Sequence, residues 1–101
     1  MIKLTKNSIL TYLKKYKQEY AQKYHIKSIG LYGSFARDEA TEKSDVDIFY
    51  ESDDDFSMGL FEFGAFIEKI EKDLHTKIDF VNLNNMNPII KYYAKKDFIY
   101  V

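Results

Sequence analysis

The chain has 101 residues, of which 46% are hydrophobic and 17% aromatic, enough for the packed core of one domain. Its 15 Lys and Arg against 16 Asp and Glu give a formal net charge of -1, so we expect no direct binding of long nucleic acids through counterion release. With no cysteine and no apolar run near the roughly 18 residues of a membrane span, the composition predicts a single cytoplasmic domain over residues 1–101, without disulfides and away from membranes.

The N-terminal half of the chain predicts helices and strands in alternation. Apolar residues recur three and four positions apart near the start, as on one face of an amphipathic helix. A short run rich in β-branched and aromatic residues then stops at Gly33, which is typical of a strand. Ser34 follows at a position suited to an N-cap. The expected segments are 5–23 for a long helix, 26–32 for a strand, 34–40 for a short helix and 45–51 for a second strand.

The C-terminal half continues the alternation. Asp53, Asp54 and Asp55 favour a turn that caps a helix, and we assign them no metal. Asn87 precedes Pro88 as a capping residue precedes a proline at the first helical position. The expected segments are 58–74 for a second long helix, 77–81 for a third strand, 88–95 for a short helix and 97–101 for a fourth strand. This order predicts an α/β (α+β) fold with helices packed on one mixed sheet of about four strands.

Two aspartates in the second predicted strand carry the strongest chemical signal. Asp45 and Asp47 are two positions apart, so in a strand they point to one face about 6 to 7 Å apart. Asp79 in the third predicted strand can join them if the two strands are neighbours. Two ionised carboxylates about 5 Å apart repel by roughly 3 kcal/mol at an effective dielectric near 20, so a compensating cation is expected. Carboxylate, water and phosphate oxygens are the ligands of Mg²⁺, and the pattern therefore predicts a magnesium site.

The turn after the first strand predicts an anion site. Gly33 allows close approach of a phosphate, and Ser34 adds a hydroxyl donor beside exposed backbone N–H groups. Arg37 lies one helical turn further on, either near the same anion or in a salt bridge with a neighbour such as Asp38 or Glu42. Carboxylates opposite a phosphate cradle predict a nucleoside triphosphate site of the two-metal type.

These motifs resemble a known superfamily. G-S-x-A-R, then S-D-x-D and a later lone aspartate, are similar to the DNA polymerase β nucleotidyltransferases, and most similar to their minimal nucleotidyltransferase (MNT) branch. The similarity also takes in 58–81 and 87–101, so it covers most of the chain. It implies a nucleotidyltransferase fold, ATP as substrate and two Mg²⁺ ions. The residues it implies are Gly33 and Ser34 for the triphosphate, Asp45 and Asp47 for both metals, and Asp79 to complete one metal site.

The chain departs from the family pattern at two turns. Asp38 stands where the family usually has a glycine after the arginine. His75 and Thr76 stand where relatives more often have a turn that contains glycine. Neither departure removes a residue of the expected site.

The resemblance also implies a partner. MNT proteins similar to this one are typically antitoxins that pair with a HEPN ribonuclease and neutralise it by transferring AMP from ATP to a tyrosine. We therefore expect an adenylyltransferase antitoxin that forms a hetero-oligomer with a HEPN-type toxin. Two alternatives stay open: a non-catalytic antitoxin that acts by occlusion, and nucleotidyl transfer to a small molecule with a separate substrate-binding subunit.

Overall fold

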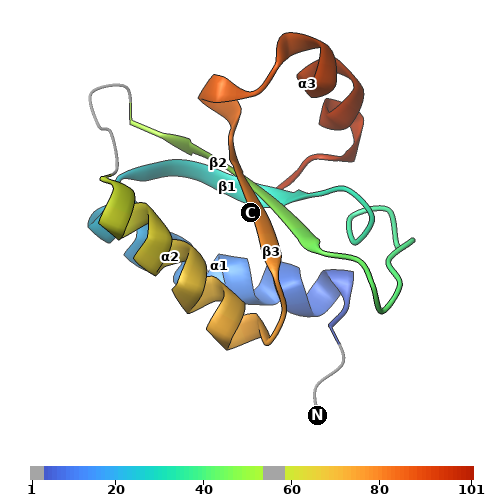
Figure 1. Cartoon of the computed structure of the whole chain (residues 1–101), viewed down its shortest axis with the longest axis horizontal. Helices are drawn as coiled ribbons and strands as arrows, with labels where there is room; N and C mark the ends of the chain where they lie inside the picture. The colour runs from blue at the N-terminus through green and yellow to red at the C-terminus, as the bar shows by residue number, and fades with distance from the viewer. Residues whose placement is uncertain (1–3, 54–58) are drawn as a thin grey trace.

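The computed structural model describes residues 4–53 and 59–101, which form three helices on a four-stranded mixed sheet (Figure 1). The helices are α1 (Lys6–Tyr24), α2 (Leu60–Leu74) and α3 (Pro88–Ala94). The strands are β1 (Ile26–Tyr32), β2 (Val46–Ser52), β3 (Ile78–Asn82) and β4 (Ile99–Tyr100), and short 3-10 helices η1 (Leu83–Asn85) and η2 (Lys95–Asp97) flank α3. The predicted α+β class, with helices on one mixed sheet, is confirmed.

The strands lie in the order β3-β2-β1-β4. β1 is antiparallel to both of its neighbours, whereas β2 and β3 are parallel and are connected through α2. A parallel pair needs a crossover of this kind, because a hairpin can join only antiparallel strands. The sheet thereby brings the second and third predicted strands side by side.

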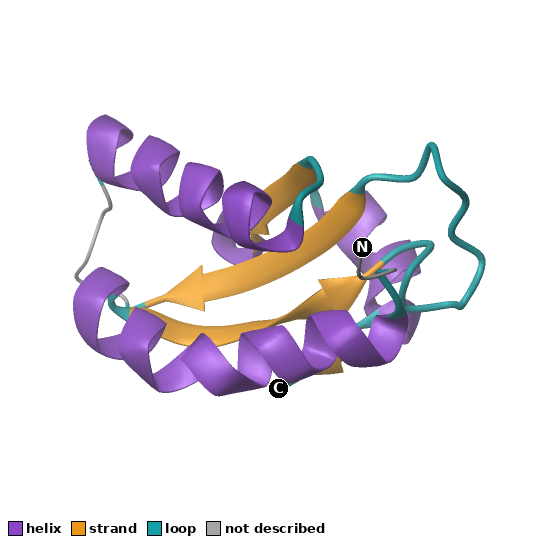
Figure 2. Ribbon diagram, turned by 90° about the horizontal axis from the view of Figure 1, so that it is seen from below, coloured by secondary structure: helices purple, strands orange, loops and turns teal. Residues whose placement is uncertain are grey.

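The two long helices cover one face of this sheet, and α3 lies beyond the other side (Figures 1 and 2). Successive side chains of a strand point to opposite faces. In β2, the buried residues Val46, Ile48 and Tyr50 belong to the core cluster beneath α1 and α2. Asp47 and Phe49 alternate with them, so they point to the face away from the long helices.

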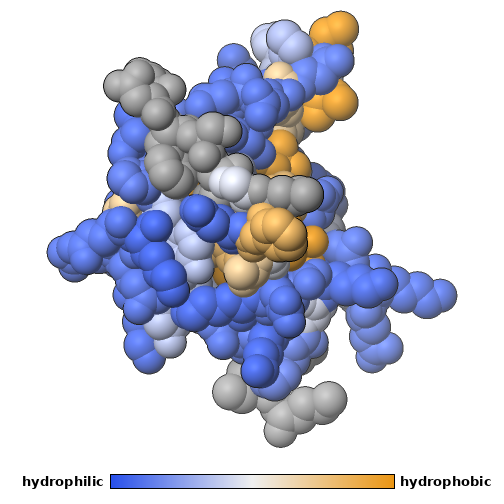
Figure 3. All heavy atoms as spheres, turned by 60° about the vertical axis from the view of Figure 1, so that its left-hand side comes forward, coloured by the Kyte–Doolittle hydropathy of each residue, from blue (hydrophilic) through white to orange (hydrophobic). Residues whose placement is uncertain are grey.

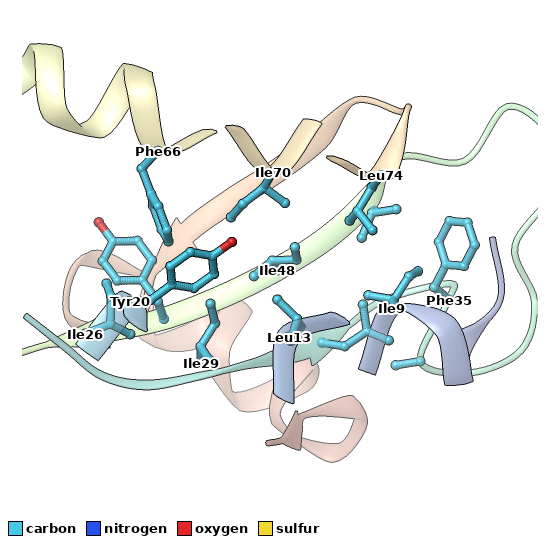
Figure 4. Close-up of a cluster of buried hydrophobic side chains, with 14 of the residues drawn as sticks. Ile9, Leu13, Tyr20, Ile26, Ile29, Phe35, Ile48, Phe66, Ile70 and Leu74 are labelled. Atoms are coloured by element: carbon cyan, nitrogen blue, oxygen red, sulfur yellow. The ribbon is translucent and has the colours of Figure 1, made fainter. Parts of the chain in front are cut away.

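The core between the long helices and the sheet is built from aliphatic and aromatic side chains of four elements. Figure 4 shows side chains of α1 and α2 converging on Ile29 of β1 and Ile48 of β2. The side chains that are fully buried in this cluster are Ile9, Leu13, Tyr20, Ile29, Leu31, Val46, Ile48, Phe66 and Ile70. Large-to-small substitutions at such positions typically cost 2 to 5 kcal/mol, so this core fixes the sheet that carries the site.

The ends of α1 follow from its sequence. Thr5 and Ser8 form a reciprocal capping box, in which each backbone N–H donates to the other's hydroxyl oxygen at 3.1 and 2.9 Å. The helix ends at His25, whose φ of 56° lies in the left-handed region. The predicted segment 5–23 therefore differs from the helix by one residue at each end.

The predicted short helix over 34–40 is wrong: this segment is a succession of turns. Arg37 N–H donates to the Gly33 carbonyl at 3.1 Å, which makes a single helical turn. Asp38 then adopts a φ of 58°, and the N–H of Glu39 donates back to the Ser34 carbonyl at 2.8 Å. This backbone pattern terminates a helix, because a left-handed residue reverses the chain direction. We call residues 33–39 the Gly-Ser turn.

Smaller differences concern the ends of elements. β2 begins at Val46, so Asp45 lies immediately before the strand that was expected to contain it. The fourth strand shrinks to Ile99–Tyr100, because residues 95–97 form a 3-10 helix. The expected start of the second long helix and the expected turn at Asp54 and Asp55 lie outside the described residues.

Within the described ranges, no helix has both the length and the apolar character that crossing a membrane requires.

Candidate active site

Two of the predicted carboxylates are brought together by the parallel strand pair. Asp47 of β2 and Asp79 of β3 are direct Cα partners in the ladder. Neighbouring strands lie about 4.8 Å apart, so the two side chains leave the same face of the sheet from adjacent backbones. Asp47 is half-buried and Asp79 is exposed. This face is the one that α1 and α2 leave uncovered.

The third predicted carboxylate lies just outside the sheet. Asp45 is exposed and precedes β2, yet its charge still acts on Asp47. Across residues 4–53 and 59–101, no three His, Cys, Asp or Glu side chains form a group that could hold a metal ion. The structure therefore gathers Asp47 with Asp79 and keeps Asp45 in electrostatic range, without a preformed cage of three ligands.

The electrostatics single out Asp47. Burial, followed by the charges of Asp79 and Asp45, raises the pKa of Asp47 to about 6, and the positive charge of Arg37 opposes this shift. Each of the raising effects disfavours the ionised carboxylate. Among the described residues, none donates a hydrogen bond to Asp47. A bound cation would instead favour the ionised carboxylate of Asp47, and carboxylate oxygens are ligands that suit Mg²⁺.

Gly33 lies against Asp47 at the end of β1. Its φ of +78° is in the left-handed region, where a side chain is disfavoured. A Cβ at this position would overlap a carboxylate oxygen of Asp47. The glycine is thus required both by its backbone conformation and by the close approach of the carboxylate.

Ser34 and Phe35 follow Gly33 in the Gly-Ser turn. Ser34 is half-buried, whereas Phe35 and the adjacent Ala36 are buried and anchor the turn to the core. No described residue accepts a hydrogen bond from the backbone N–H of Ser34 or Phe35. Free N–H groups at the start of a helical turn are donors for an anion.

The Arg37 side chain is held by two carboxylates. Its Nη1 is 2.8 Å from Asp97 and its Nε is 3.1 Å from Glu39. The salt bridge that the sequence offered as an alternative therefore exists, with partners other than Asp38 and Glu42. The Asp97 pair links the Gly-Ser turn to η2, 60 residues further along the chain. Phosphate binding by Arg37 stays a prediction, and it would compete with these pairs.

Sequence reasoning overlooked Tyr32. It is the Cα partner of Asp47 across β1 and β2, so Tyr32, Asp47 and Asp79 form one row across three strands. Burial, with the charges of Asp47 and Asp79, raises the pKa of the Tyr32 phenol to about 12. Its ring meets Phe98 edge-on at 5.6 Å between centroids. Strand parity alone puts Tyr32 near the carboxylates once β1 and β2 are paired, and that pairing was the missing information.

The family relationship is clear at the level of sequence. A model of the nucleotidyltransferase domain family matches residues 13–101. A Methanocaldococcus jannaschii protein assigned by name to the protein adenylyltransferases is 40% identical over 98 residues, which are 96% of this chain and 98% of the relative. The chain is also similar to the protein adenylyltransferase MntA of Thermococcus cleftensis, with 31% identity over 100% of both chains.

Solved structures share the fold at lower identity. A structure described as a minimal nucleotidyltransferase gives a TM-score of 0.77 at 19% identity over 95% of each chain. A toxin-antitoxin structure with AMP-PNP gives 0.60 at 20% identity over 86% of this chain and 64% of the other. A tri-AMPylated Shewanella oneidensis HEPN toxin in complex with MNT antitoxin gives 0.59 at 16% identity, over 94% and 66%. At these identities the likeness concerns the fold.

Proposed function

Because this chain belongs to the minimal nucleotidyltransferases of the nucleotidyltransferase domain family, we propose that it transfers AMP from ATP to a tyrosine of a HEPN-type toxin and so neutralises it. The observation that best supports this reaction is the position of Asp47, in ladder register with Asp79 on one side and against Gly33 on the other. Relatives named as protein adenylyltransferases and complexes of HEPN toxin with MNT antitoxin support the acceptor.

The carboxylates of the site fit Mg²⁺. Asp47 carries a raised pKa among like charges, and oxygen is the only donor atom that Asp45, Asp47 and Asp79 offer. In the proposal, Asp45 and Asp47 hold two ions and Asp79 completes one of the sites. When bound, the ions supply positive charge against the phosphates and the departing pyrophosphate. Because Asp45 is exposed and lies outside the strand, we expect its side chain to become ordered when the metal ions bind.

The chain's own residues have distinct parts in the transfer. The N–H groups and hydroxyl at Gly33 and Ser34 seat the triphosphate. The tyrosine oxygen forms a bond to the α-phosphorus while the bond from that phosphorus to the pyrophosphate oxygen breaks. Asp79, on the acceptor's side of the row, receives the phenolic proton. A phenol with a pKa near 10 suits such a base better than an alkyl alcohol does.

The mass of the partner tests the proposal. Incubating the wild-type chain with its HEPN-type partner, ATP and Mg²⁺ should add one or more AMP units to the partner. Asp79→Asn should reduce this transfer by at least about 100-fold, the scale of one general base, while much of the ATP binding remains. Glu68→Gln removes an exposed carboxylate on α2 and should leave transfer unchanged.

Two results would contradict the proposal. A partner that is silenced without any gain in mass would favour occlusion. A nucleotide found on a small molecule while the partner stays unmodified would favour the other alternative, transfer with a separate substrate-binding subunit.

A further inference from the structure

A cavity of about 730 Å³ lies at the C-terminal end of the fold. We call it the aromatic groove, and its lining comes from α3, η2 and the β4 region. The lining residues are Tyr92, Tyr93, Lys95, Lys96, Phe98 and Tyr100. Its volume is within the range of small-molecule sites, about 300 to 1,000 Å³.

The aromatic groove keeps large rings in contact with solvent. Tyr92 and Tyr93 are each 64% exposed, and Tyr100 is 55% exposed. None of the residues of α3 is buried. Figure 3 shows apolar surface toward the top of the molecule, where α3 lies, and a second apolar patch in the middle of that face. Exposed rings with lysines beside them are the combination that stacks on a nucleobase and attracts phosphate.

Two contacts place the groove beside the Gly-Ser turn. The Arg37 guanidinium pairs with Asp97, the residue between Lys96 and Phe98, at 2.8 Å. The Tyr32 ring, next to Gly33 in sequence, meets the Phe98 ring at 5.6 Å. A ligand seated at the turn therefore has the aromatic lining as its neighbour.

The sheet order decides which part of the reaction the groove can serve. Asp79 lies on β3 at one edge of the sheet, and the groove lies at β4 on the other edge. The Gly-Ser turn leaves β1, the strand beside β4. The groove is thus on the side of the nucleotide, with β2 and β1 between it and the side where the acceptor approaches Asp79.

The face of the sheet also continues from the carboxylates to the groove. Phe49 is two residues beyond Asp47 on the same face, about 6.6 Å along the strand. Its buried ring stacks on Phe98 at 4.4 Å and meets Tyr100 edge-on at 4.9 Å. The distance of about 6.6 Å between Asp47 and Phe49 is similar to the length of the ribose that separates a base from its α-phosphate.

Given the proposed nucleotidyl transfer, we infer that the aromatic groove receives the base of the nucleoside triphosphate, stacked on the rings of Tyr93 and Tyr100. Lys95 and Lys96, which belong to the lining, then contribute positive charge toward the phosphates. Every nucleobase can stack on an aromatic ring, so the groove strengthens the binding of the nucleotide without selecting a particular base.

Calorimetric titration of the full chain with two probes tests this inference, and both are used with Mg²⁺. ATP carries base and phosphates, whereas inorganic tripolyphosphate carries phosphates alone. The Tyr93→Ala/Tyr100→Ala variant should bind ATP at least about fivefold more weakly than the wild type, since stacking on an aromatic ring is worth about 1 kcal/mol or more per base. Its affinity for tripolyphosphate should stay within about twofold.

Two control variants isolate the rings. Tyr93→Phe/Tyr100→Phe keeps both rings and loses only the hydroxyls, so its ATP affinity should match the wild type. Phe61→Ala removes a ring on α2 that is 92% exposed and should also change nothing. Photolabelling of the unaltered chain with 8-azido-ATP adds a readout that no folding defect can affect, and the label should fall within residues 92–100.

Unchanged ATP affinity in the alanine variant, or a photolabel confined to other segments, would overturn the inference while leaving the proposed function intact. Normal ATP binding with loss of partner modification would also overturn it and would assign the groove to the partner. A wild-type chain that binds neither probe would refute the proposed function, and the inference with it.

Discussion

Among single residues, the site depends on one glycine and one carboxylate that lie in close contact. Gly33 leaves room for Asp47, and Asp47 sits among like charges in a half-buried position. Gly33 is therefore poorly replaceable because a side chain has no room there, whereas the charge of Asp47 is unfavourable in the folded chain without a cation. Each also gives a measurement that separates the site's cost to stability from its chemistry.

Gly33→Ala should destabilise the chain and remove ATP binding. The new Cβ meets the Asp47 carboxylate and forces a left-handed φ on a residue with a side chain, which costs about 1 to 2 kcal/mol. Urea unfolding measures the loss, and titration with ATP and Mg²⁺ measures binding. Gly64→Ala is the matched control, because a Cβ there meets nothing within 4 Å and α2 should gain about 0.5 to 1 kcal/mol. Equal stability of both variants would contradict the prediction.

Asp47→Asn should stabilise the metal-free chain at pH 7 and not at pH 4. The folded state raises the pKa of Asp47 from 3.8 to about 6, so between these values it binds more protons than the unfolded state does. The contribution of Asp47 to stability therefore falls as the pH rises through this range. Thermal melts with a chelator at both pH values measure the difference between wild type and variant. A variant less stable than wild type at pH 7 would show that the carboxylate has a stabilising partner.

At the scale of elements, three chain reversals in the described part of the chain use a residue other than glycine in the left-handed region. His25 ends α1, His75 ends α2 and Asp38 ends the single turn after Gly33, with φ between 56 and 58°. Asp38 and the His75 turn are the two places where the resemblance to the family led us to expect glycine. The left-handed φ at both positions suits glycine, and the chain forms both turns without it.

Asp38→Gly should raise the free energy of unfolding by about 0.5 to 1 kcal/mol. Glycine adopts the left-handed conformation without steric cost, although it loses more backbone entropy on folding. The exposed ion pair of Asp38 with Lys6, at 3.6 Å, contributes little. Asp38→Val should lower stability by 1 kcal/mol or more, because β-branching opposes this conformation. Urea unfolding of the three proteins gives the order, and a valine variant as stable as wild type would contradict it.

The sequence predicts some elements of the fold better than others. Periodicity and caps locate the long helices and the main strands to within a few residues, because these signals are local. The helix predicted over 34–40 does not form, because the left-handed conformation of Asp38 reverses the chain despite several good helix formers around it. Gly33 and Asp79 could be identified from the sequence because they belong to a recognisable motif. The positions of Tyr32 and the aromatic groove depend on which strands pair. Strand pairing is a long-range property that no window of the sequence contains.

At the scale of the whole molecule, binding should be visible as stability. ATP with Mg²⁺ at a hundred times the dissociation constant adds about 2.7 kcal/mol, because only the folded chain presents the site. Thermal melts should show this shift in the wild type and in the Glu68→Gln control. The shift should vanish in Asp45→Ala/Asp47→Ala, and an equal shift in that variant would mean that the nucleotide binds elsewhere.

The alignment of Asp47 with Asp79 has a consequence for folding fidelity. If β3 slipped by one residue against β2, Asp79 would turn toward α2 and be buried as a charge among apolar side chains. Ile78 and Phe80 would at the same time leave the core for water. A misaligned chain would therefore be both unstable and inactive. The carboxylate of Asp79, which the proposed chemistry needs, thus also favours the correct register of β3 against β2.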